Sequence, residues 1–99
     1  MSEITSAYES VMVISLRLND EEIQSLIEKF KALISENATL NDVDEWGKRR
    51  LAYQINKESE AYYVLFSFTS TAEFPAELDR RYKITDGILR SMIIKKDEK

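Results

Sequence analysis

The hydrophobic residues of this 99-residue chain follow two different periods in a fixed order, and that order constrains the fold more than any other feature. Alternation of apolar and polar residues is typical of strands, whereas apolar residues three and four apart are typical of helices. In chain order, the patterns predict a strand over 8–17, a helix after Asn19, strands over 40–55 and 62–69, a short helix from Pro75 and a strand over 88–94. The polar segment 57–60 is expected to form the hairpin turn between the second and third strands.

Single residues mark where these elements begin, bend or end. Asn19 and Glu22 have the spacing of a capping box, which predicts a helix start, and Asn37 is a suitable stop. Pro75 suits the first turn of the second helix, and Gly47 predicts a bulge or kink inside the long second strand. The first helix has one apolar stripe, assigned to the core: Ile23, Leu26, Ile27, Phe30, Leu33 and Ile34.

The order β-α-β-β-α-β predicts an α+β fold of the ferredoxin-like type. In this fold a four-stranded antiparallel sheet carries both helices on one face and leaves the other face uncovered. The length fits a single domain over residues 1–99, of which 1–7 and 95–99 are expected to be flexible.

The central strands are apolar on both sides. One side carries Tyr8, Met12, Ile14 and Leu16 in the first strand and Tyr62, Val64, Phe66 and Phe68 in the third. The opposite side carries Val11, Val13, Tyr63 and Leu65. Because large exposed apolar surfaces are usually binding sites, this pattern favours a partner on the uncovered face. The alternative is that two faces of a central strand are apolar without any partner.

Cysteine and histidine are both absent. Their absence excludes disulfides, thiolate zinc sites and histidine-dependent triads within the chain. Any catalysis would have to rest on carboxylates, Lys, Tyr or Arg. On these grounds, together with the family resemblance given below, we expect no enzyme activity, cofactor, metal site or small-molecule substrate. No apolar run is long enough to span a bilayer and the start lacks the features of a signal peptide, so the protein is expected to stay in the cytoplasm, away from membranes.

The formal net charge of −4 argues against tight, unaided binding to nucleic acid, but the cations are clustered. Clusters lie at 48–50, at 80–83 and near the C-terminal end. The segment 46–55 places its cations beside Trp46 and Tyr53, a composition suited to phosphate contacts and base stacking. On composition alone, an edge strand whose charges block aggregation is the simpler interpretation.

The sequence of that segment, W-G-K-R-R-L-A-Y-Q-I, resembles the signature of the bacterial small-subunit ribosomal protein six family. Further similarities lie at Tyr8-Glu9, Lys57, 61–66, Glu77-Leu78, Arg81-Tyr82, Asp86 and 89–94. Together they cover about nine-tenths of the chain, and the first motif is highly specific.

The resemblance implies a ferredoxin-like domain without catalysis that pairs with a basic protein, small-subunit ribosomal protein eighteen. Together the two would bind the central domain of the small-subunit ribosomal RNA in the cytoplasmic ribosome. By position, the RNA-facing cations would be Lys48, Arg49, Arg50 and Arg90. Contacts to RNA or to the protein partner would come from Tyr8, Trp46, Tyr53 and Tyr63. A basic neighbour would offset the acidic net charge, so RNA binding is expected to be cooperative with that partner.

Two positions depart from the family pattern. Ser6 and Ala7 precede Tyr8 where the family often has an arginine, which puts in doubt any RNA contact made by that arginine. Gln54 stands where the family often has proline, which restores a backbone donor.

Other functions fit the residues less well. Asp42, Asp44 and Gly47 resemble part of a calcium loop, but Trp46 and Tyr53 occupy positions that require oxygen ligands. An acylphosphatase-like enzyme needs a glycine-rich phosphate cradle after the first strand, where this chain has carboxylates. An RNA-recognition motif expects Lys or Arg and then Gly before its aromatics, which 58–61 does not supply. The remaining alternative is a small-molecule-binding regulatory domain that homodimerises through its sheet.

Overall fold

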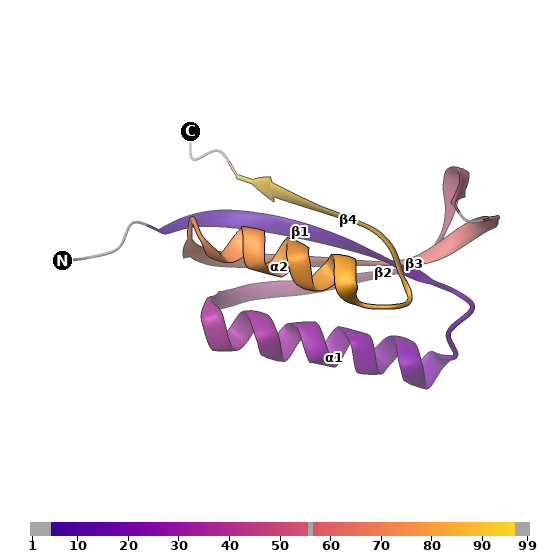
Figure 1. The fold of residues 1–99 in the computed structure, drawn as a ribbon, viewed down its shortest axis with the longest axis horizontal. Helices are drawn as coiled ribbons and strands as arrows, with labels where there is room; N and C mark the ends of the chain where they lie inside the picture. Colours follow the sequence, from indigo (N-terminus) through magenta and orange to yellow (C-terminus); the bar gives the residue numbers. More distant parts are fainter. Residues whose placement is uncertain (1–4, 56, 97–99) are drawn as a thin grey trace.

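Two helices lie on one side of a four-stranded antiparallel sheet (Figure 1). The computed structural model describes residues 5–55 and 57–96. Its elements are β1 (Thr5–Ser15), α1 (Asp20–Asn37), β2 (Thr39–Ile55), β3 (Glu58–Thr71), α2 (Phe74–Ile84) and β4 (Ile88–Lys95). The strand order is β2-β3-β1-β4, so β1 and β3 are central while β2 and β4 form the edges. The predicted ferredoxin-like fold is confirmed.

The local signals in the sequence act where they were predicted to act. Asn19 caps α1: its Oδ1 accepts a hydrogen bond from the Glu22 amide at 2.8 Å, and Glu22 Oε1 accepts one from the Asn19 amide at 2.9 Å. Pro75 lies in the first turn of α2. Gly47 has a φ of +82°, and the β2–β3 register shifts between Glu45 and Gly47, so the glycine forms the predicted bulge.

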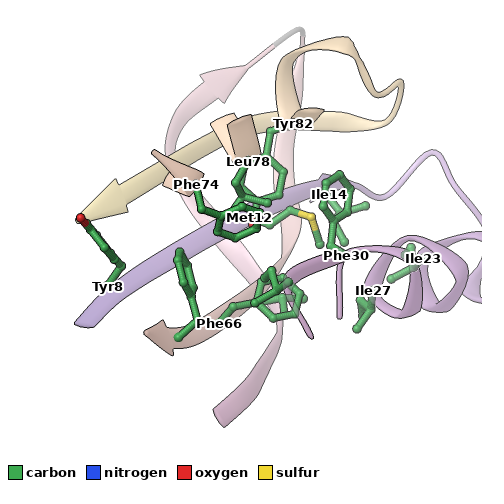
Figure 2. Packing of buried hydrophobic residues seen from close by; sticks show 13 residues of the cluster. Tyr8, Met12, Ile14, Ile23, Ile27, Phe30, Phe66, Phe74, Leu78 and Tyr82 are labelled. Atoms are coloured by element: carbon green, nitrogen blue, oxygen red, sulfur yellow. The ribbon is translucent and has the colours of Figure 1, made fainter. Parts of the chain in front are cut away.

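The hydrophobic core lies between the sheet and the two helices (Figure 2). Phe30 of α1 and Tyr82 of α2 meet there with ring centroids 4.7 Å apart, over fully buried Met12 of β1. The Tyr82 hydroxyl is hydrogen-bonded to Ser10 Oγ, so the two buried polar groups satisfy each other.

The strands extend further than the sequence suggested. Thr5 pairs with Thr71, and Lys95 pairs with Tyr8, so residues 5–7 and Lys95, which we expected to be loose, have strand partners. Residues 1–4 and 97–99 lie outside the described part of the chain. The expected turn over 57–60 was wrong for 58–60, because β3 begins at Glu58 directly after Lys57, whose φ is 67°.

Candidate docking face of the sheet

The side of the sheet without helices, called the open face below, carries most of the exposed large apolar side chains. By strand alternation and pairing, the open face includes Val11, Val13, Trp46, Arg49, Leu51, Tyr53, Ala61, Tyr63, Arg90, Met92 and Ile94. Within the described residues, the exposed large apolar side chains on this face are Trp46 (38%), Tyr53 (64%), Met92 (47%) and Ile94 (48%). A surface of this kind is typical of a protein that binds other molecules.

The end of the β2–β3 hairpin turns away from the helices and over this face (Figure 1). Leu51 is buried there in a small second cluster with Val13 and Ala61. Arg90 Nη1, from the opposite edge strand, donates a hydrogen bond to Tyr53 Oη at 3.2 Å. The two edges of the sheet therefore approach each other above its central strands.

A shallow groove lies beneath that contact. Its two parts, of about 180 and 160 Å³, share Val13, Tyr63 and Arg90 as lining residues. Leu51 and Tyr53 line the first part, while the second continues toward β4. The floor is apolar and one cation lies at the rim, which suits an apolar side chain or a stacked ring.

The Gly47 bulge organises an aromatic stack on the open face. The Trp46 ring stacks on Tyr63, with centroids 6.1 Å apart and 16° between the planes. Trp46 Nε1 donates to Asp44 Oδ2 at 3.0 Å, and the Arg49 guanidinium lies 5.6 Å from the indole centroid. The indole is therefore held in place while more than a third of it remains exposed.

The two basic clusters within secondary structure differ in their partners. In α2, Glu77 accepts hydrogen bonds from Arg80 and Arg81 at 2.8 Å, and Lys83 pairs with Asp79 at 2.9 Å. The arginines lower the pKa of Glu77 to about 2, and that carboxylate raises the pKa of Arg80. These cations already have counter-charges on their own helix.

In the described residues, by contrast, the β2 cations Lys48, Arg49 and Arg50 form no ion pair with any carboxylate. Arg49 lies on the open face, while Lys48 and Arg50, next to it in the strand, alternate to the other side of the edge. The cluster therefore presents cations from both sides of one sheet edge.

The structure removes Tyr8 from the predicted surface residues. Its side chain lies on the helix side, is only 8% exposed and stacks on Phe68 with centroids 5.7 Å apart. A ring packed in the core cannot stack on a base. Trp46, Tyr53 and Tyr63 are brought together on the open face with Arg49 and Arg90. Met92 and Ile94 were missed, although their alternation with Ile93 was the available signal.

The described part of the chain can be compared with what a metal ion and a membrane-spanning helix require. Among residues 5–55 and 57–96, no group of three or more acidic side chains could hold a metal ion. Neither of the two described helices is long and apolar enough to cross a bilayer.

Comparison with known proteins identifies the family. The family model for ribosomal protein S6 matches residues 7–95. The chain belongs to the ribosomal protein S6 family. A relative from Thermoanaerobacter pseudethanolicus, named small ribosomal subunit protein bS6, is 52% identical over 93% of this chain and 98% of its own. A protein of the same name from Clostridium perfringens is 49% identical over 92% of this chain and 97% of its own. The names are those of ribosomal proteins, and S6 proteins are not enzymes.

A solved S6 structure has the same fold. The crystal structure of the 30S ribosomal protein S6 from Thermotoga maritima matches with a TM-score of 0.89. The two chains are 28% identical, and the match covers 94% of this chain and 89% of the other. The S6 fold thus includes both the covered and the uncovered faces described above.

Proposed function

We propose that the protein is a structural component of the small ribosomal subunit in the cytoplasm, which binds small-subunit ribosomal RNA together with the basic small-subunit protein eighteen. The observation that carries this proposal is the open face, where Arg49, which has no ion pair among the described residues, and a fixed aromatic stack adjoin a half-exposed apolar surface. Membership of a ribosomal protein family supplies the setting.

The β2 edge is the part suited to RNA. Lys48, Arg49 and Arg50 are exposed and lack carboxylate partners in the described chain, so binding phosphates would break no internal ion pair. The Trp46–Tyr63 stack beside them offers a flat surface to an unstacked base. Arg90 is a further cation on the same face, at the rim of the groove.

The β4 side is the part suited to a protein partner. Met92 and Ile94 are about half exposed there, and the groove continues toward them. A net charge of −4 favours a basic neighbour, and such a neighbour would neutralise phosphates that this chain cannot. RNA binding is therefore cooperative with the protein partner and weak without it.

Binding of purified components tests the proposal. The full chain is titrated with central-domain ribosomal RNA, with and without protein eighteen, and a tagged copy is followed through sedimentation of native ribosomes. We expect the tag in the small-subunit peak, and RNA binding that is much tighter with the partner present. A stable homodimer absent from that peak would favour the regulatory-domain alternative, and equal RNA affinity with and without the partner would refute cooperativity.

A further inference from the structure

The carboxylate of Glu58, directly after the turn of the β2–β3 hairpin, connects the hairpin end to the end of β1. It accepts hydrogen bonds from Ser15 Oγ at 2.8 and 2.9 Å and from the Leu16 amide at 3.3 Å. Arg17 Nε lies 3.5 Å from the same carboxylate. The Glu58 side chain is only 10% exposed, so these contacts, called the Glu58 bridge below, are largely shielded from water.

The ladder between β2 and β3 is interrupted next to this bridge. Arg50 pairs with Glu60 and Ile55 pairs with Glu58, so 51–54 stand against the single residue Ser59. Regular strand pairing therefore does not fix the segment that carries Leu51 and Tyr53. Its shape depends on side-chain contacts.

The Glu58 bridge acts on the other arm of the hairpin, where it ties the first residue of β3 to the end of β1 and is the strongest of the contacts that hold the hairpin end. The Tyr53–Arg90 hydrogen bond is exposed and 3.2 Å long, and the packing of Leu51 on Val13 is not directional. Hydrogen bonds to a shielded carboxylate are roughly twice as strong as neutral ones and fix direction as well. Loss of the bridge would leave the hairpin end attached to β1 only through the β1–β3 ladder, which stops at the Ser15–Ala61 pair.

We propose that Glu58 is a positioning residue that holds the β2–β3 hairpin over the open face in the shape that docks. This inference rests on the proposed function, and it assigns Glu58 a role through the shape of the hairpin rather than through contact with RNA or the protein partner. Ordering a loose hairpin on binding weakens affinity, so a hairpin ordered beforehand binds more tightly.

The test uses small ribosomal subunits depleted of this protein as the binding probe. We compare wild type with Glu58→Ala, Glu58→Gln, Ser15→Ala and the double variant with both alanines. Glu60→Ala, two residues away and exposed, is the control. Hydrogen exchange of the backbone amides of 51–55 reports hairpin order in the free protein.

Glu58→Ala is expected to weaken binding roughly tenfold and to speed exchange in 51–55. Glu58→Gln keeps an acceptor of the same shape and should recover part of the affinity. The double variant should bind no more weakly than Glu58→Ala, because both changes remove the same contact. The Glu60→Ala control should bind as the wild type does.

Different results would overturn different claims. Equal binding by wild type, Glu58→Ala and Ser15→Ala would overturn this inference and leave the proposed function intact. Weaker binding with unchanged hairpin exchange would also overturn it, since Glu58 would then act by direct contact. A wild type that fails to bind the depleted subunits would overturn the proposed function and this inference together. If Glu58→Ala does not fold, Ser15→Ala and Glu58→Gln decide by the same criteria.

Discussion

The two faces of the sheet are built from the same strands but are completed differently. On the helix side, Met12, Val64 and Phe66 are fully buried and the Ser10–Tyr82 pair satisfies its own hydrogen bonds. On the open face, Met92 and Ile94 remain about half exposed, and the rings of Trp46 and Tyr63 stack beside Arg49. The covered face holds the main core, whereas the open face has only the small Val13–Leu51–Ala61 cluster and keeps apolar area and charge exposed.

A second comparison, between the two basic clusters, sharpens the first. Arg80, Arg81 and Lys83 each form an ion pair within α2, while the cations of 48–50 have no carboxylate partner among the described residues. Positive charge counted in a sequence is therefore not equal to positive charge available to a ligand. Availability depends on which side chains the fold places beside each cation.

The largest expected effect is on stability and lies on the covered face. Phe66→Ala should lower the free energy of unfolding by about 3–5 kcal/mol, because it leaves a cavity under both helices. Met92→Ala, its counterpart on the open face, should cost less than about 1 kcal/mol because half of that side chain is already in water. Urea unfolding of both variants measures the difference. Equal losses would show that the two faces contribute alike to folding.

The next effect is on binding and separates the two basic clusters. Arg49→Gln with Arg50→Gln should weaken binding to depleted small subunits by roughly ten- to hundredfold, with the fold intact. Arg80→Gln with Arg81→Gln makes the same change in net charge within the paired cluster and should leave binding near the wild-type level. Normal binding by the first pair would remove those arginines from the RNA-facing set.

Within the covered face, Tyr82→Phe should lower the free energy of unfolding by about 1–2 kcal/mol, because the buried Ser10 hydroxyl loses its hydrogen-bond partner. Burial raises the pKa of Tyr82, consistent with a ring kept neutral in the core. Adding Ser10→Ala to Tyr82→Phe should recover part of the loss, and chemical unfolding of the single and double variants measures this. Strict additivity would show that the hydroxyls do not depend on each other.

The smallest effect concerns pH and the paired cluster. The folded pKa of Glu77, about 2, lies below its ordinary value of 4.5, so its ion pairs stabilise the protein fully above about pH 5. That contribution is lost as pH falls through 2. Glu77→Gln should therefore melt slightly below the wild type at pH 6 and level with it near pH 2. A melting difference that is the same at both pH values would contradict this assignment.

The sequence was sufficient for features that depend on near neighbours. The Asn19–Glu22 capping box, the Gly47 bulge and Pro75 in α2 each act within a few residues. Alternation alone grouped Tyr8 with Met12 and Ile14 on one side of the first strand, and the structure shows that this is the core side. Tyr8 was predicted to contact RNA or the protein partner because of the family resemblance. In the structure its side chain is buried in the core, as are Met12 and Ile14, which share its side of the strand.

The features that could not be predicted join distant parts of the chain. The Glu58 bridge joins residues 43 positions apart, and the Arg90–Tyr53 contact spans 37. Both depend on how the hairpin turns over the sheet, which no local pattern encodes. The carboxylates that pair with the α2 cations, Glu77 and Asp79, lie within four residues of them in the sequence. Composition alone nevertheless did not distinguish the α2 cations from those of 48–50, which form no ion pair among the described residues.

Oxidative footprinting of the protein, free and within the small subunit, tests most directly whether the open face is the docking surface. The side chains to compare are Trp46, Tyr53 and Met92 on that face and Ile84, an exposed residue at the end of α2. The account predicts strong protection of the first three after incorporation and little change at Ile84. Unchanged labelling of the first three, or protection confined to Ile84, would contradict it.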